Sequence, residues 1–349
     1  MPGVFVKNIA LCFDHGRDRS GSAGVKNASA LVALLQSDAD QIVWSRPDSD
    51  AISHHHFPRR HRRSQALDRA RTSVVEAYEF LVDRWEPGDR LFIFGSGHGA
   101  YCARALTHLL GTVGILRGPD SARWRAADLT EYVLSAYAIP RTPRSTSDWR
   151  RVGRLAARLS GRSEIAVEVD FLGLWDTVAL PGLPRPDTPD PLPNVIAARH
   201  AIAIDGGYGP FDVQPLAPAG DGVEEVWFRG AHDDVAGGQN ACTPLSQIAL
   251  DWVLDGAEHA GAVPQPSNRL APSAADALAE GAHTLSFRKV PADAAVHASV
   301  ESYLRTHPSY WRRLPARVTW ADPDWEARSE RLMDTASSAD AVPALVGAS

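Results

Sequence analysis

Cysteine, lysine and long apolar runs are all scarce in this chain of 349 residues. The three cysteines, Cys12, Cys102 and Cys242, are odd in number and widely spaced, and they form no CxxC pair. This pattern argues against a disulfide framework and against a cysteine-based zinc site. Lysine occurs only three times, and arginine supplies the other positive charges. No apolar run approaches the ~18 residues that a membrane-spanning helix needs, so we expect no integral membrane segment.

A basic excess is also missing, because the formal net charge is −6. Nucleic-acid binders usually carry a basic excess or a basic stripe, so we expect no nucleic-acid partner. The segment Met1–Phe5 lacks the charged and apolar regions of a signal peptide. The sequence therefore predicts a cytoplasmic protein, with export by a route that needs no signal peptide left open. Hydrophobic residues make up 44% and charged residues 22%, as in ordinary globular proteins.

Strand and helix patterns alternate along the chain. Apolar, β-rich runs predict strands at Val4–Phe13, Gln41–Ser45, Arg90–Phe94, Ile165–Trp175, Val195–Ile204 and Glu224–Phe228. Helical spacing predicts helices at Lys26–Gln36, Ser64–Trp85, His98–Leu110 and Leu245–Ala260, and Gly230–Gly238 has the composition of a polar turn. This order predicts an α/β fold with a mostly parallel central sheet that helices cover on both faces.

The middle of the chain is more helical than the rest. Two helices are expected at Arg125–Tyr137 and Ser147–Ser160, and they would form an insertion or cap at about 118–164. We expect a single domain over residues 1–334. The remaining segment, Thr335–Ser349, is rich in Ala and Ser and is expected to be a disordered tail.

Familiar cofactor and metal motifs are missing as well. No lysine follows the glycines of the chain's glycine-rich turn, which excludes a P-loop, and the G-x-G-x-x-G pattern of dinucleotide sites is not met. The run His54–His56 lies with His61 in a polar loop, where adjacent histidines cannot all face one ion. We therefore expect neither a cofactor nor a metal.

The glycine-rich turn lies between a predicted strand and a predicted helix. The strand Leu91–Phe94 runs into Gly95-Ser96-Gly97-His98-Gly99, and a helical pattern follows. The nucleophile elbow of an α/β-hydrolase has the pattern G-x-S-x-G, in which the central serine is lifted above the sheet. The spacing fits here, but Gly97 stands at the centre. Ser96 is one position early, and its side chain is expected to point away from the site.

Five segments, taken in order, match the motifs of one family. The first segment is Phe13-Asp14-His15-Gly16, and the second is the elbow run, Phe94-Gly95-Ser96-Gly97-His98-Gly99-Ala100-Tyr101-Cys102-Ala103-Arg104. The other three are Phe171-Leu172-Gly173-Leu174-Trp175-Asp176-Thr177-Val178, His200-Ala201-Ile202-Ala203-Ile204-Asp205 and Val226-Trp227-Phe228-Arg229-Gly230-Ala231-His232-Asp233-Asp234-Val235-Ala236-Gly237-Gly238. Together they resemble the α/β-hydrolase domain family, long of unknown function, that includes phospholipase effectors of type VI secretion. The matches span about Phe13 to Trp252, and the resemblance implies an α/β-hydrolase fold and a lipid-like or ester ligand.

The resemblance also implies roles for particular residues. Gly97 occupies the position of the nucleophile, Asp176 that of the acid, and His232 that of the general base, in the chain order typical of the fold. The backbone N–H of His98 and one from the turn Asp14 to Gly16 would be the oxyanion donors. A rival assignment of the acid and the base, Asp234 with His297, stays open.

The departures from the family pattern gather at this site. Gly97 replaces the serine, His98 replaces an arginine, and His15-Gly16 replaces a Gly-Thr pair. Without the hydroxyl no acyl-enzyme can form at this position, so ordinary serine-hydrolase activity is not expected.

Three functions remain open from the sequence. The first is a reprogrammed enzyme in which a His/Asp pair acts as general base in place of a serine nucleophile. The second is a pseudoenzyme that binds a ligand or a protein partner through the old pocket. The third is an esterase or lipase that uses Ser96, which would require the turn to slide by one residue.

Overall fold

The structure is a computed structural model that describes residues 6–14, 25–46, 59–117, 123–183, 191–206, 213–217, 222–265, 271–281, 287–328 and 330. Eight strands form one sheet in the order β2-β1-β3-β4-β5-β6-β7-β8. The strands are β1 (Asn8–Asp14), β2 (Gln41–Ser45), β3 (Arg90–Ser96), β4 (Val169–Trp175), β5 (Val195–Ala203), β6 (Val223–Phe228), β7 (Ala295–His297) and β8 (Thr319–Ala321). Every neighbouring pair is parallel, so the sheet is parallel throughout rather than mostly parallel.

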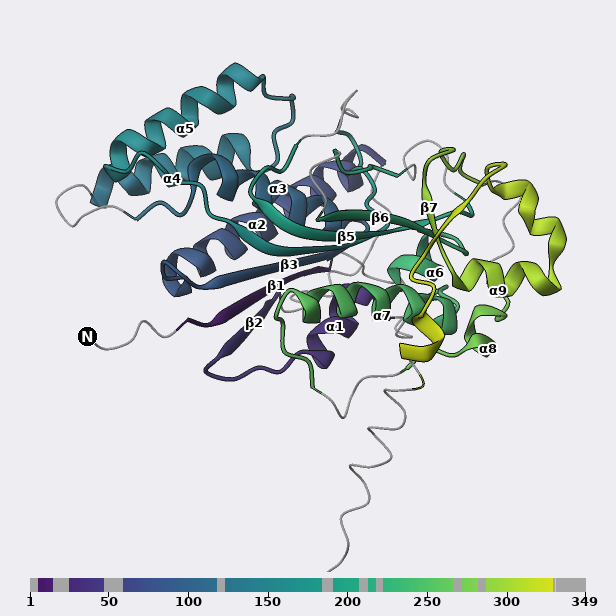
Figure 1. The fold of residues 1–349 in the computed structure, drawn as a ribbon. Helices are drawn as coiled ribbons and strands as arrows, with labels where there is room; N and C mark the ends of the chain where they lie inside the picture. The colour runs from purple at the N-terminus through teal and green to yellow at the C-terminus, as the bar shows by residue number, and fades with distance from the viewer. Residues whose placement is uncertain are drawn as a thin grey trace, which may run out of the picture.

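Helices cover both faces of this sheet, as the alternation of elements predicts (Figure 1). One face carries α2 (Arg59–Arg84), α3 (His98–Val113), α4 (Arg123–Tyr137) and α5 (Thr146–Ser160). The other carries α1 (Asn27–Leu34) and α7 (Thr243–His259), with the short helices α6 (His232–Ala236) and α8 (Ala274–Ala277) beside them. The helix α9 (Ser299–Thr306) and the 3-10 helix η4 (Pro308–Arg313) lie at the β8 edge.

The strands are apolar on both faces because both faces are covered. In β4, Phe171 belongs to the core beneath α7, whereas Leu172 belongs to the core beneath α3. Strand β1 alternates in the same way, with Cys12 on the α7 side and Phe13 on the α3 side. The architecture is that of an α/β-hydrolase, and the helical pair α4 and α5 is inserted between α3 and β4.

Several predicted elements differ in extent from those observed. The strand expected from Ile165 begins only at Val169, and the polar turn expected at Gly230–Gly238 contains the short helix α6. Strands β7 and β8 follow the last strand that was predicted. Each has only three residues, too few to show a period-2 pattern. The expected tail, Thr335–Ser349, and the run His54–His56 lie outside the described residues.

The order of the strands fixes where a ligand can bind. The chain leaves β1 toward β2 on one side and leaves β3 toward β4 on the other, so the carboxyl ends of β1 and β3 flank a topological switch point. Ligands of open α/β sheets bind in the crevice at such a point. The glycine-rich turn, which follows β3, therefore lies where the fold favours a site.

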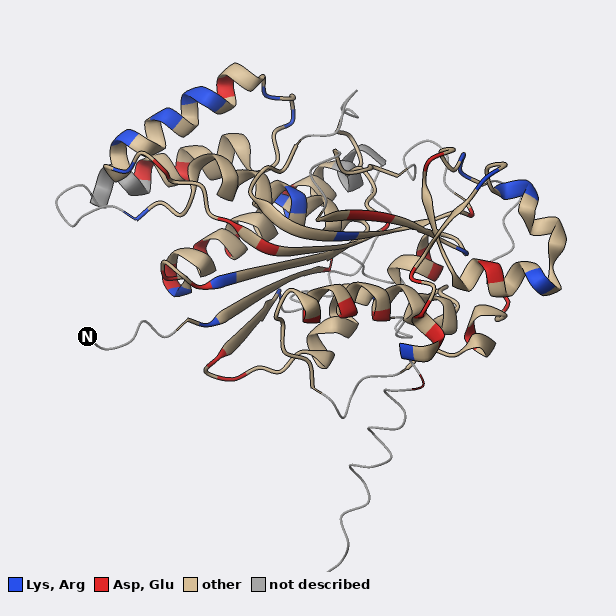
Figure 2. Ribbon diagram, in the orientation of Figure 1, with Lys and Arg blue, Asp and Glu red and all other residues tan. Residues whose placement is uncertain are grey.

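Charged side chains differ between two of the helices. The outer face of α5 carries exposed arginines, whereas the Asp and Glu side chains of α7 include the buried Asp251 and Asp255 (Figure 2). Among the described residues, no helix has both the length and the apolar character needed to cross a bilayer.

Candidate functional site

The turn after β3 has the geometry of a nucleophile elbow. Gly97 caps the N-terminus of α3 with φ 56° and ψ −114°. A Cβ on Gly95 would lie 2.5 Å from the carbonyl oxygen of Gly99, and a Cβ on Gly99 would lie 2.1 Å from the carbonyl oxygen of Phe13. The flanking glycines thus permit a close approach of strand and helix that no larger residue allows, as the motif predicts.

Asp176 follows β4 directly and is fully buried. Its backbone has φ 44°, an unusual value for a residue other than glycine. Its Oδ1 accepts a 3.0 Å hydrogen bond from the N–H of Ala203, and the guanidinium of Arg288 donates to both carboxylate oxygens. Burial by itself would raise the pKa of Asp176. The charge of Arg288 and the hydrogen bond from His232 more than offset burial and hold that pKa well below its usual range.

His232 is the first residue of α6 and reaches Asp176 from the adjoining turn. Its Nδ1 lies 2.7 Å from Oδ2 of Asp176. The side chain of His232 is 24% exposed, while that of Asp176 is 0% exposed. An anionic carboxylate beside Nδ1 favours the tautomer whose proton is on Nδ1, because only a protonated ring nitrogen can donate a hydrogen bond to the carboxylate. The other nitrogen, Nε2, then holds the lone pair that a general base needs.

Nε2 of His232 lies opposite the centre of the elbow. A Cβ built on Gly97 would be 3.0 Å from Nε2 and 3.1 Å from Cε1 of the same ring. Glycine at this position lets the imidazole come closer to the elbow than a serine side chain would allow without a small shift of the ring. The structure thus brings Gly97, Asp176 and His232 together, three of the residues that the sequence singled out.

His98, the residue after Gly97, adds a second imidazole to this region. Burial, followed by the charges of His232 and Lys26, lowers the pKa of His98 to about 4, although a hydrogen bond with the backbone of Ala179 opposes the shift. Its side chain is therefore neutral near pH 7. Its backbone N–H is the first of α3, one of the amides that have no acceptor within the helix.

Ser96 points away from the elbow, as its position in the motif predicts. It is 1% exposed, and its Oγ accepts a 3.0 Å hydrogen bond from the N–H of Ala28, at the start of α1. The hydroxyl thus joins β3 to the helix on the opposite face of the sheet.

The rival acid and base do not contact each other in the hydrogen bonds of the described residues. Asp234 accepts from the N–H groups of Ala231 at 2.9 Å and Cys242 at 2.7 Å, which ties the two ends of the α6 turn. The ring nitrogens of His297 lie 2.8 Å from Ser299 Oγ and 3.3 Å from an oxygen of Asp322. Each residue thus has its own partners, far along the chain from the other's.

The predicted oxyanion turn is described only at its first residue. Asp14 ends β1 opposite Ser96, and its backbone N lies 3.3 Å from the Cβ position of Gly99. The carboxylate of Asp14 accepts a 2.5 Å hydrogen bond from Ser29 Oγ. His15 and Gly16 lie outside the described residues.

Two further cations at the site were not predicted. Arg288, which clamps Asp176, lies 112 positions away in the sequence and belongs to no recognisable motif. Lys26 contacts both α6 and the turn after it, since its Nζ lies 3.9 Å from Oδ1 of Asp233 in the helix and 3.4 Å from the carbonyl oxygen of Gly237 in the turn. Nothing in the sequence connects Arg288 with Asp176. No group of three or more His, Cys, Asp or Glu side chains within the described segments could hold a metal ion.

A comparison with known protein families shows to which family this chain belongs. Residues 7–256 match the family described as "T6SS, Phospholipase effector Tle1-like, catalytic domain". The chain belongs to this family. The matched range runs from β1 to α7 and includes the elbow, Asp176 and His232.

One curated protein and one solved structure are among the chains that match this one. An uncharacterized protein of Saccharomyces cerevisiae, YEL023C, is 26% identical over 229 residues, which are 59% of this chain and 32% of that protein. A crystal structure of an uncharacterized protein from Pseudomonas aeruginosa shares 15% identity with a TM-score of 0.40 and is matched over 98% of this chain and 60% of that one. The chain therefore spans about a third of the length of the yeast relative and three fifths of the bacterial one.

Proposed function

We propose that the protein is a divergent hydrolase of ester bonds in phospholipid-like substrates, in which the pair His232 and Asp176 activates a water molecule in place of a serine nucleophile. The observation that carries this proposal is the position of His232 Nε2, 3.0 Å from where a Cβ on Gly97 would lie. The base faces the elbow, but no hydroxyl stands between them. A water molecule in that space would occupy the position of the missing nucleophile.

The reaction that this arrangement supports is a direct hydrolysis. His232 Nε2 removes a proton from the water as its oxygen attacks the acyl carbon, and the carbonyl oxygen gains negative charge. The backbone N–H of His98 stabilises that charge from the N-terminus of α3. Collapse of the intermediate breaks the ester bond, and the imidazolium returns its proton to the leaving alcohol. Asp176, kept anionic by Arg288, stabilises the imidazolium throughout.

The family supports the choice of substrate class. The family is described by its likeness to a phospholipase effector, and the matched residues include those that we place in the reaction. We therefore expect acyl esters of phospholipids to be the preferred substrates and other carboxylic esters to be weaker ones.

The test is hydrolysis by wild-type protein and by His232→Gln. We expect the wild type to release fatty acid from phosphatidylglycerol vesicles or from short-chain acyl esters, and the variant to lose about 10²- to 10⁴-fold in kcat. His259→Gln is the matched control, because its side chain is 76% exposed and lies outside the site. Release of fatty acid that His232→Gln leaves unchanged would contradict the proposal.

A pseudoenzyme is the second candidate, favoured by the absence of a hydroxyl at Gly97. In that case the elbow binds a ligand or partner without turnover, and neither phosphatidylglycerol vesicles nor short-chain acyl esters would be hydrolysed. An esterase that uses Ser96 makes a different prediction, since a fluorophosphonate would label Ser96 in the wild type. The burial of Ser96 and its bond to Ala28 count against that outcome.

A further inference from the structure

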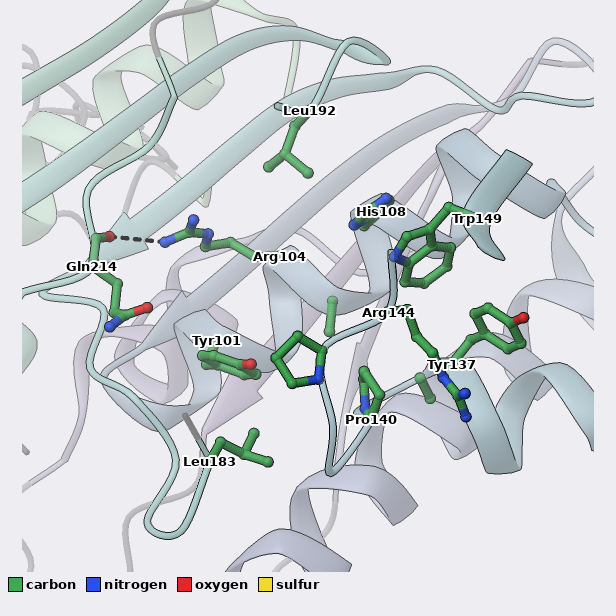
Figure 3. Close-up of a pocket in the computed structure, with 13 residues that line it drawn as sticks. Tyr101, Arg104, His108, Tyr137, Pro140, Arg144, Trp149, Leu183, Leu192 and Gln214 are labelled. Carbon is green, nitrogen blue, oxygen red and sulfur yellow. Dashed lines mark hydrogen bonds between the residues drawn. The ribbon is translucent and has the colours of Figure 1, made fainter. Parts of the chain in front are cut away.

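A separate cavity lies between the outer face of α3 and the inserted helices α4 and α5 (Figure 3). Tyr101, Arg104, Ala105 and His108 line it from α3, and their spacing of three and four residues places them on one face of that helix. Its volume is about 150 Å³. Cavities of roughly this size hold an apolar body as large as benzene, that is, about six carbons.

The walls of this cavity are aromatic and apolar on one side. The rings of His108 and Trp149 stack with centroids 4.2 Å apart, and Tyr137 meets Trp149 edge-on at 5.0 Å. Leu183 and Leu192 add apolar side chains elsewhere on the wall. Such walls favour a hydrocarbon chain or a ring over a strongly hydrated ligand.

The charge of the lining is of one sign. The thirteen described residues that line the cavity include Arg104 and Arg144 and no acidic side chain. Figure 3 places Arg104 beside Gln214, whose carbonyl oxygen accepts from its Nη1 at 2.8 Å, and Arg144 beside Tyr137. The two guanidinium groups favour an anion at the lining of this cavity, and Asp148, which interacts electrostatically with Arg144, is the acidic neighbour that an anion would have to compete with.

Arg144 retains the capacity to bind that anion. Its Nε and Nη2 donate to the carbonyl oxygen of Ala136, both at 3.1 Å, and its guanidinium lies 5.0 Å from the centroid of Tyr137. Its Nη1 makes no hydrogen bond within the described part of the chain. The side chain is exposed at the rim of the cavity, so its free donors can reach an anionic group whose apolar part lies inside.

We infer that this cavity is a binding site for a small anionic amphiphile, a carboxylate or phosphate monoester carried on about six carbons. The inference does not rest on the proposed reaction, because neither His232 nor Gly97 lines the cavity. The cavity nevertheless begins near the elbow, since the N–H of Tyr101 lies 3.4 Å from the carbonyl oxygen of Gly97. A bound amphiphile would therefore contact the first turn of α3, the helix that follows the elbow.

The experiment is calorimetric titration of the full chain with hexyl phosphate, hexanoate and hexanol. We expect saturable binding of at least one anion and about tenfold weaker binding of the neutral alcohol, because charge-assisted hydrogen bonds are lost. Tighter binding of hexyl phosphate would identify a phosphate monoester as the ligand class, and tighter binding of hexanoate would identify a carboxylic acid. Absence of saturable binding for both anions, or equal affinity for hexanol, would overturn the inference.

Two variants separate the charge from the space. Arg144→Gln removes the cation at the rim and should weaken the preferred anion about tenfold, whereas Arg144→Lys should retain part of the affinity. Ala105→Phe fills the cavity from α3 and should abolish binding while both arginines remain. The control is Arg158→Gln, which removes an exposed charge of α5 outside the cavity and should leave affinity unchanged. If Arg144→Gln and Ala105→Phe both bound as the wild type does while remaining folded by thermal melting, the site would lie elsewhere.

Discussion

Within the described residues, two histidine–aspartate pairs, His232 with Asp176 and His297 with Asp322, are built alike and placed differently. Asp176 follows β4 and Asp322 follows β8, and they are the non-glycine residues with positive φ in the described segments, at 44° and 54°. Each carboxylate also binds an arginine, Arg288 in the first pair and Arg328 in the second. Burial opposes ionisation of both, yet their hydrogen bonds and positive neighbours hold the pKa of each well below its usual range.

The pairs differ in what faces the second nitrogen of the ring. His232 is partly exposed, and its Nε2 faces the elbow at Gly97. His297 is fully buried, both of its nitrogens have partners, and its ring stacks on Phe228 with centroids 4.5 Å apart. A histidine, a carboxylate and a cation therefore do not define a reactive site. What distinguishes the first pair is a ring nitrogen that faces the elbow and has no hydrogen-bond partner among the described residues, and this difference leads to four predictions.

The largest effect is expected from restoring the hydroxyl. Gly97→Ser should gain covalent labelling by a fluorophosphonate, because the positive φ of the elbow is retained and His232 needs to move by only a few tenths of an ångström. Loss of a triad nucleophile typically costs about 10⁶-fold in kcat, so even partial restoration should be measurable by mass spectrometry of the labelled peptide.

Double variants make this result specific to the first pair. Labelling should disappear in Gly97→Ser/His232→Gln and persist in Gly97→Ser/His297→Gln. Labelling that survived loss of His232, or that required His297, would show that the first pair is not the base of this site.

The acids should differ next most strongly. Asp176→Asn leaves His232 without the anion that fixes its tautomer, and we expect turnover of the preferred ester to fall by about 10⁴-fold. Asp322→Asn should leave turnover per folded molecule within about twofold, since the histidine beside it touches no substrate. The measurement is kcat on protein whose folded fraction is known from circular dichroism. A similar loss in both variants would remove the distinction between the pairs.

The arginines behind the acids give a smaller contrast. Arg288→Lys keeps the charge but loses the two-point grip on Asp176, so the dyad should be slightly misplaced. We expect kcat to fall by about ten- to a hundredfold with KM little changed, and the pH profile of kcat to move because Asp176 is less firmly held anionic. Arg328→Lys is the matched control, and both of these readouts should be unaltered in it. A purely structural role for Arg288 would lower the melting temperature without moving the pH profile.

Much of this arrangement could be predicted from local sequence. The glycine spacing predicted the elbow, and the apolar runs predicted the inner strands, because each depends on neighbours in the chain. The direction of Ser96 also followed from its place in the motif. Local patterns carry this information wherever one short segment makes the structure by itself.

The remainder depends on contacts between distant segments. Arg288 approaches Asp176 from 112 positions away, and no periodicity marks it. The choice between His232 and His297 stayed open in the sequence because a sequence pattern does not show which ring nitrogens have partners. It depends on which ring has a free nitrogen, which only the packing of Phe228 and Asp322 around His297 reveals. Strands β7 and β8 were missed because three residues show no period.

The smallest effect is expected in the pH dependence of stability, which depends on the buried histidine, His297. Burial lowers the pKa of His297, although Asp322 opposes the shift. The folded state therefore binds a proton less readily than the unfolded state, whose histidine has a pKa of about 6.5. The stabilising contribution is complete above that value and is lost as pH falls below it, by at most about 1.4 kcal/mol per pH unit.

His297→Gln should accordingly flatten the fall in melting temperature between about pH 7 and pH 5, even though it lowers stability at pH 8. His259→Gln, which removes an exposed histidine, should leave that slope unchanged. An unchanged slope in His297→Gln would mean that this ring takes up its proton equally in the folded and unfolded states, and a steeper fall would mean that the second pair is an ion pair like the salt bridges of Arg328 rather than a neutral, closed contact.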